Sequence, residues 1–192
     1  MRKLSVICIF ALLGTAHAED RLSTIEVYGL KIPGTPAIAK AAGFTDCKDN
    51  SSSYICTSTK PIVIAGVRAE SARVFFDGSD NFSENNRGST RKITDVSPEK
   101  LTYGGIRFDF SDRQALKKAL ITDGWMESSN NYGSEYYKDG IAANFSIQKL
   151  GVSLNPLSLK KVAEHIGKLK AEQESKSKAE AASTSFIDAM KN

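Results

Sequence analysis

The sequence feature that most constrains the fold is a pattern that occurs twice. When the chain is shifted along itself by 81 residues without a gap, Ile25 falls on Ile106. The same shift brings Gly43 onto Gly124, and an aromatic residue follows each of these glycines. Each copy has the order expected of a strand, a short helix that ends at glycine, and a hairpin. The sequence therefore predicts an α+β fold. In it, two tandem β-α-β-β(-β) repeats form antiparallel sheet with short helices on one face, and a C-terminal helix follows.

The domain organisation follows from this pattern and from local composition. Between the two copies lies a stretch rich in Gly, Asn, Ser and charged residues, which is typical of a polar connection. After Pro156, apolar residues recur at helical spacing as far as Leu169, and a polar, charged segment follows. The predicted parts are a signal peptide (1–18), a first repeat (19–76), a polar linker (77–100), a second repeat (101–155) and a C-terminal helical extension (156–192).

The N-terminal segment has the pattern of a signal peptide. Two basic residues precede an apolar run over residues 4–14, and Ala16-His17-Ala18 matches an A-x-A cleavage site. The run is too short to span a membrane as a helix, which needs about 20 apolar residues. We therefore expect a mature chain that begins at Glu19, has no integral membrane segment and is periplasmic or secreted.

Cleavage leaves a chain with little net charge. It removes two of the 26 basic residues and none of the 22 acidic ones, so the net charge falls from +4 to +2. The basic residues are also scattered along the chain. This balance argues against binding to nucleic acid or to an anionic membrane surface. The expected partner is another envelope or secreted protein.

Two cysteines remain in the mature chain, Cys47 and Cys56. They flank a polar turn, and export would place them in an oxidising compartment. Their spacing differs from the C-x-x-C of redox-active pairs. The sequence predicts a structural disulfide that closes a hairpin and stabilises it by about 2–3 kcal/mol.

Catalytic and cofactor motifs are not found in the sequence. His165 is the single histidine of the mature chain, so a zinc site has too few nitrogen and sulfur ligands, and a Ser-His-Asp or Cys-His catalyst would need this same residue. No Gly-rich phosphate loop joins a strand to a helix. We therefore expect no cofactor, no metal and no enzymatic activity. The alternative is a small envelope hydrolase acting through paired carboxylates. Candidates near strand or helix ends are Asp46, Asp109, Asp112, Asp123 and Glu127.

Aromatic and amide residues point instead to protein binding. Tyr132, Tyr136 and Tyr137 occur with several Asn and Ser residues in one short hairpin. Tyrosine is favoured at interfaces because it buries a large area at a small rotamer cost. One of Tyr136 and Tyr137 must point into the core, and the sequence leaves open whether the other does. The predicted binding residues are three anchors, Tyr132, Tyr137 and Phe82, with Arg73 and Arg87 as charges at the rim.

A resemblance supports the same expectation. The order Pro33-Gly34-Thr35-Pro36, a helix, Gly43 and then two cysteines resembles the repeat of the beta-lactamase inhibitory proteins. The small outer-membrane-assembly lipoproteins share a related single unit. The resemblance implies short helices on an antiparallel sheet and a bias towards protein binding. The predicted function is an exported, non-enzymatic protein-binding module of the inhibitor, immunity or envelope-accessory type.

Overall fold

A computed structural model describes residues 22–50, 53–77 and 101–190. The predicted signal peptide and most of the predicted linker, with Phe82 and Arg87, lie outside these ranges. The strands are β1 Ile25–Val27, β2 Leu30–Ile32, β3 Phe44–Asn50, β4 Ser53–Ser58, β5 Val63–Ile64, β6 Val67–Arg68, β7 Ser71–Asp77, β8 Thr102–Asp109, β9 Met126–Asn130, β10 Gly133–Tyr137, β11 Ala143–Gln148 and β12 Gly151–Pro156. The helices are α1 Pro36–Ala41, α2 Arg113–Thr122 and α3 Leu159–Met190.

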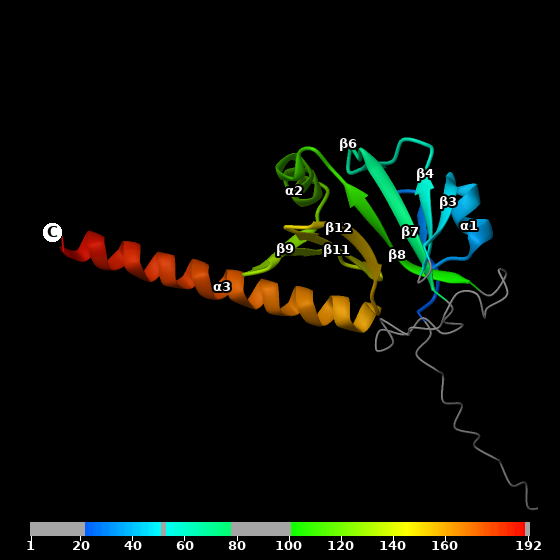
Figure 1. Ribbon diagram of the computed structural model, residues 1–192. Helices are drawn as coiled ribbons and strands as arrows, with labels where there is room; N and C mark the ends of the chain where they lie inside the picture. The colour runs from blue at the N-terminus through cyan, green and yellow to red at the C-terminus, as the bar shows by residue number, and fades with distance from the viewer. Residues whose placement is uncertain (1–21, 51–52, 78–100, 191–192) are drawn as a thin grey trace, which may run out of the picture.

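One antiparallel sheet organises the molecule (Figure 1). Its eight strands lie in the order β3-β4-β7-β8-β12-β11-β10-β9. Two further pairs, β1-β2 and β5-β6, form separate two-stranded sheets. The predicted α+β class is confirmed, and the sheet is continuous across both halves of the chain.

Local sequence explains where the two short helices begin and end. The Thr35 side chain accepts a hydrogen bond at the start of α1, and Asp112 accepts one from Ala115 N at the start of α2. Gly43 and Gly124 follow the two helices with φ of +96° and +86°. Glycine adopts this left-handed conformation without steric cost, so both helices stop where the sequence predicts.

An apolar row crosses the inner face of the sheet, which α1 and α2 cover. Its members pair directly with one another from strand to strand. From β4 to β10 they are Cys56, Val74, Ile106, Leu154, Phe145 and Tyr136. All belong to one core cluster with Ala39 of α1 and with Leu116 and Leu120 of α2. Residues from both predicted repeats therefore share a single core.

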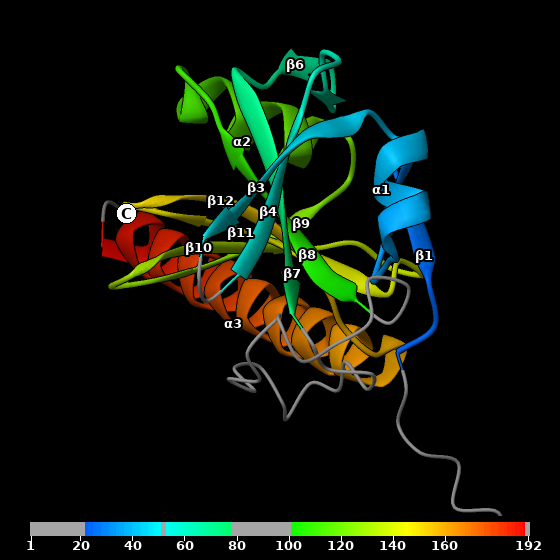
Figure 2. The same cartoon turned by 45° about the vertical axis from the view of Figure 1, so that its right-hand side comes forward.

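Helix α3 packs against the opposite, outer face (Figures 1 and 2). Its Val162 and Ile166 are buried against Tyr137, in a cluster separate from the main core. Residues 170–183 of the same helix are exposed, and the helix continues away from the sheet (Figure 1). Val162 and Ile166 of the predicted stripe thus pack on the sheet, whereas Leu159, which was also predicted to pack there, has an exposed fraction of 55% because it lies at the first position of the helix. The polar segment after the stripe forms an extension.

The two halves share part of their topology. Each contains a helix, a left-handed glycine and a hairpin, which are β3-β4 in the first half and β9-β10 in the second. The halves differ after the hairpin. In the first half, β4 pairs with β7, and the intervening strands β5 and β6 form a separate small sheet. In the second half, β10 pairs with the next strand, β11. The tandem repeat therefore stays a prediction.

The predicted disulfide between Cys47 and Cys56 is present. The two residues are directly opposite one another on β3 and β4, so the bond ties the edge strand β3 to the strand beside it. Among the helices of the described ranges, none is long and apolar enough to cross a membrane.

Candidate binding surface

A row of polar side chains crosses the outer face of the sheet. From β4 to β10 its members are Thr57, Arg73, Arg107, Ser153, Ser146 and Glu135. Successive residues of a strand point to opposite faces, so this row lies back to back with the apolar row. Ser146 is buried, whereas Arg107 is exposed. The part of the outer face formed by β7, β8 and β12 is therefore accessible.

This accessible part contains a hollow of about 300 Å³, which we call the outer hollow. Arg73 and Phe75 of β7 line one side, and Arg107 of β8 lines the middle. Ser153 of β12 and Leu150 of the β11–β12 turn line the other side. The hollow thus combines two guanidinium groups, one aromatic ring, a hydroxyl and an aliphatic side chain.

Among the residues that the structure describes, one positive charge of the outer hollow is uncompensated. Arg73 Nη2 lies 2.7 Å from Asp109 Oδ2, which also accepts a hydrogen bond of 2.5 Å from the Ser71 hydroxyl. Arg107 lies over the Phe75 ring, with 4.6 Å between the guanidinium carbon and the ring centroid. Asp109 therefore neutralises one of the two arginines, and the second rests on an aromatic face.

A second hollow, of about 440 Å³, lies at the tip of the β9–β10 hairpin, and we call it the tip hollow. Tyr132 lines it together with two basic side chains of α2, Arg113 and Lys117. Lys149 of the β11–β12 turn completes this basic side. Arg113 Nη1 donates to the carbonyl oxygens of Gln148 and Lys149 at 3.0 and 2.8 Å, so helix α2 holds that turn in place.

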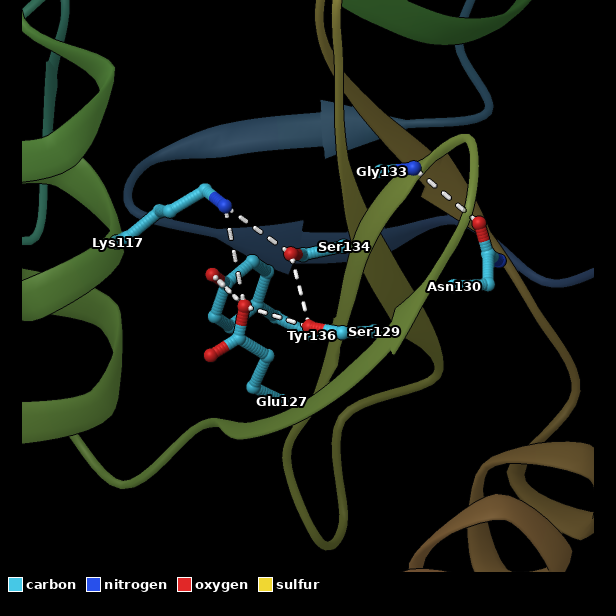
Figure 3. A network of polar contacts seen from close by, with 7 residues as sticks. All are labelled: Lys117, Glu127, Ser129, Asn130, Gly133, Ser134 and Tyr136. Atoms are coloured by element: carbon cyan, nitrogen blue, oxygen red, sulfur yellow. Dashed lines mark hydrogen bonds and ion pairs between the residues drawn. The ribbon is translucent and has the colours of Figure 1, made fainter.

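A polar network fixes the hairpin beneath the tip hollow (Figure 3). The Tyr136 hydroxyl donates to Glu127 Oε1 at 2.8 Å, and the Ser129 hydroxyl donates to the same oxygen at 3.0 Å. Lys117 Nζ donates to the Ser134 hydroxyl at 3.1 Å and lies 3.9 Å from Glu127 Oε1. This network joins α2 to both strands of the hairpin.

The network also sets the protonation state of its members. Burial raises the pKa of the Glu127 carboxyl, but hydrogen bonds from Ser134, Tyr136 and Ser129 and the charge of Lys117 outweigh burial and lower it. Burial and the bond to Glu127 raise the pKa of Tyr136. The network therefore holds an ionised carboxylate and a neutral phenol at neutral pH.

The two hollows meet at the β11–β12 turn, because Gln148 lines both. Two large apolar side chains stand out there. Tyr132 has an exposed fraction of 83%, and Leu150 of 94%. We call the surface formed by Tyr132, Lys149 and Leu150 the turn surface.

The structure brings together two of the predicted binding residues and separates a third. Tyr132 lines the tip hollow and Arg73 the outer hollow, so both border the same turn. Tyr137 instead is buried, with an exposed fraction of 1%, beneath Val162 and Ile166 of α3. The prediction that Tyr137 is an accessible binding residue is therefore wrong, because α3 covers that part of the sheet.

The candidate catalytic carboxylates have separate surroundings. Asp109 contacts Arg73, and Asp112 caps α2. Asp123 accepts from the Tyr28 hydroxyl and Glu127 from the Tyr136 hydroxyl, while Asp46 is exposed on the edge strand β3. Across the described part of the chain, no three His, Cys, Asp or Glu side chains gather as a metal site requires.

Several residues of this surface were not predicted from the sequence to be binding residues. Arg107 and Asp109 alternate with apolar residues in β8, a pattern that places them together on the outer face. No sequence pattern indicated that Phe75 and Leu150 belong to this surface. They line the hollow only because β7, β8 and the β11–β12 turn lie side by side in the folded chain.

The chain was compared with protein-family models, curated proteins and solved structures. No protein-family model, curated protein or solved structure matches this chain. The resemblance to the beta-lactamase inhibitory proteins therefore stays a prediction, and the functional argument rests on the chain's own surface.

Proposed function

We propose that this chain is an exported, non-enzymatic protein-binding module that binds another envelope or secreted protein through the turn surface. The observation that carries this proposal is the exposure of Tyr132 and Leu150 on a well-supported part of the fold. Large apolar side chains clustered on a surface are typical of interaction sites. Rigid support matters because a partner then loses less free energy to ordering the surface on binding.

Charge around the turn surface indicates the kind of partner. Arg113, Lys117 and Lys149 border the tip hollow, and the outer hollow adds one uncompensated positive charge. Complementary charges steer association and help to exclude wrong partners. An acidic protein surface with an apolar patch at its centre fits this arrangement best.

Export is supported by two independent features. The N-terminal sequence has the three regions of a signal peptide. The Cys47–Cys56 disulfide is of a kind that persists in oxidising compartments and is rare in reducing ones. Together they favour a periplasmic or extracellular site of action.

A capture experiment with matched variants tests the proposal. The full mature chain is immobilised and exposed to periplasmic and extracellular extract, and affinity for the retained protein is then measured. We expect Tyr132→Ala and Leu150→Ala each to weaken binding at least about tenfold, as removal of an interface anchor does. Val63→Ala is the control, because Val63 is an exposed aliphatic residue on β5, away from the turn surface.

The melting temperatures should stay unchanged in all three variants, because each truncated side chain is exposed. Equal affinity of Leu150→Ala, Tyr132→Ala and the unaltered chain would contradict the turn surface as the interface. Release of soluble fragments from cell-wall glycan, without a stoichiometric protein partner, would favour the hydrolase instead.

A further inference from the structure

We propose that the outer hollow is a carboxylate-binding site, which takes an acidic side chain of the protein partner against Arg107 and Ser153. This inference rests on the proposed function and names the chemistry that the partner must present. It also places that chemistry on the outer face of the sheet, beside the turn surface.

The first argument is the arrangement of charge across β7 and β8. Arg73 and Arg107 are direct cross-strand partners, and like charges in this position destabilise a sheet. Asp109 forms an ion pair with Arg73. Within the described ranges, Arg107 has no carboxylate partner. Binding of one anion would remove the remaining repulsion, so the hollow favours an anionic ligand.

The second argument is that the donor groups are already oriented. The Arg107 guanidinium carbon lies over the Phe75 ring, and within the described ranges its N–H groups form no ion pair, so they are available to donate to both oxygens of a carboxylate. Ser153 is the partner of Arg107 on the other side, and its hydroxyl oxygen accepts a bond of 3.0 Å from Asn155 Nδ2. The Ser153 O–H can therefore point into the hollow as a further donor.

Arg73 adds a third, partly used group. Its Nη2 contacts Asp109, while its buried Nε has no hydrogen-bond partner among the described residues. The Arg73 guanidinium is thus not saturated by the fold, and a small shift of its side chain would bring a further N–H towards a bound carboxylate.

The charge and the shape of the hollow select a carboxylate on a protein. One uncompensated positive charge balances a monoanion, whereas a phosphate near neutral pH carries close to two negative charges. Leu150 also lines the hollow and continues into the turn surface. An acidic residue beside an aliphatic residue on the partner would occupy both at once.

A titration with short peptides tests the site directly. The probes are the N-acetylated amides of Glu-Glu-Leu-Glu-Glu and of Gln-Gln-Leu-Gln-Gln, with inorganic phosphate as a third ligand. Binding to the full mature chain is followed by NMR. We expect the glutamate peptide to shift the signals of Arg107, Ser153 and Gln148, and the glutamine peptide to leave them in place.

Two matched charge variants make the result specific. Arg107→Gln should weaken binding of the glutamate peptide at least about fivefold, as loss of a charge-assisted contact does. Arg68→Gln removes a positive charge of the same kind from an exposed position on β6, outside the hollow. It should change the affinity for the glutamate peptide less than about twofold. Arg107→Gln should keep its melting temperature, because it also removes the cross-strand repulsion.

Equal losses in the two variants, shifts confined to other parts of the chain, or tighter binding of phosphate than of the peptide would each overturn the site. The outcome is separable from that of the proposed function. Partner capture that needs Tyr132 and Leu150 but not Arg107 would reject the carboxylate site alone. Peptide binding at Arg107 by a chain that captures no protein would reject the proposed function alone.

Discussion

At the scale of single residues, Tyr28 joins parts of the chain that are 95 and 97 residues apart in sequence. Its hydroxyl donates to Asp123 Oδ2 at 2.5 Å and accepts from Trp125 Nε1 at 2.9 Å. Lys138 Nζ lies 3.0 Å from the same carboxylate oxygen. The turn between β1 and β2 is thereby tied to the connection between α2 and β9.

The contact keeps the Tyr28 hydroxyl protonated and the Asp123 carboxyl ionised, which are the forms that make the hydrogen bond. Burial, and then the bond to Asp123, raise the pKa of the Tyr28 hydroxyl well above its usual value. The bond from Tyr28, and then that from Lys138, lower the pKa of the Asp123 carboxyl. A raised tyrosine pKa stabilises the fold below about pH 10, and a lowered aspartate pKa stabilises it above about pH 4.

We therefore expect Tyr28→Phe to lower the free energy of unfolding by about 1 kcal/mol near neutral pH. The difference from the unaltered chain should shrink below about pH 4, where Asp123 is protonated in the unfolded chain, and above about pH 10, where Tyr28 ionises in the unfolded chain. Urea unfolding of both chains at pH 3, 7 and 10.5 measures this difference in the free energy of unfolding. Tyr132→Phe is the control, because Tyr132 is exposed. A difference that stays constant with pH would contradict the assigned role.

At the scale of elements, β10 has a buried tyrosine on each of its two faces. Tyr136 points to the inner face and belongs to the main core. Tyr137 points to the outer face and stacks on the His165 ring of α3, with 4.4 Å between the ring centroids. Its hydroxyl donates to Glu135. The second aromatic residue of this pair is thus a packing residue because α3 covers it.

Helix α3 should depend on its few buried side chains. We expect Val162→Asp to lower the free energy of unfolding by about 3 kcal/mol or to release the helix, because it places an unpaired charge at a site with an exposed fraction of 1%. Ala163→Asp is the matched control on the exposed side of the same helix and should cost under about 0.5 kcal/mol.

Thermal unfolding measures the stability of the two variants, and hydrogen exchange of the β10 amides measures whether α3 still covers the sheet. Faster exchange of β10 in Val162→Asp alone is the expected result. Similar behaviour of both variants would mean that α3 contributes little to covering the sheet.

At the scale of the whole molecule, the two halves of the chain are interleaved. The Tyr28 ring of the N-terminal hairpin lies 6.1 Å from Phe145 and 6.5 Å from Trp125, both in the second half. Gly34 and Tyr103 exchange two backbone hydrogen bonds of 2.9 Å. A Cβ atom at Gly34 would lie 2.4 Å from the Tyr103 hydroxyl oxygen, so only glycine allows this approach. In the middle of the sheet, β8 pairs directly with β12.

This interleaving predicts one cooperative unfolding transition. Trp125, the only tryptophan, lies in the shared core and reports on both halves through its fluorescence. Its transition should coincide with the loss of circular dichroism from the sheet and helices, as in two-state unfolding. Two separate transitions would show instead that the predicted repeats fold as independent units.

Much of the local structure could be predicted from the sequence. Thr35, Asp112, Gly43 and Gly124 set the ends of the two short helices through interactions within a few residues. Strand alternation indicated the inner positions, and the spacing of Cys47 and Cys56 indicated the disulfide. Each of these signals is local, because caps, turns and strand periodicity are read over fewer than about ten residues.

The candidate site depends on longer-range packing. The pairing of Arg73 with Arg107 and the approach of Phe75 to Arg107 arise only when β7 and β8 become neighbours in the sheet. The β11–β12 turn then brings Leu150 to the same hollow. The alternation in β8 put Arg107 on one face, but it could not identify the strands beside it.

The sequence by itself determined the α+β class, the helix ends and the disulfide, because these follow from local backbone preferences and residue pattern. Tertiary structure alone decided that Tyr137 is covered by α3 while Tyr132 and Leu150 remain exposed. The physical reason is that a strand's alternation assigns each side chain to a face, but only the packing of distant elements decides whether that face meets another layer or solvent.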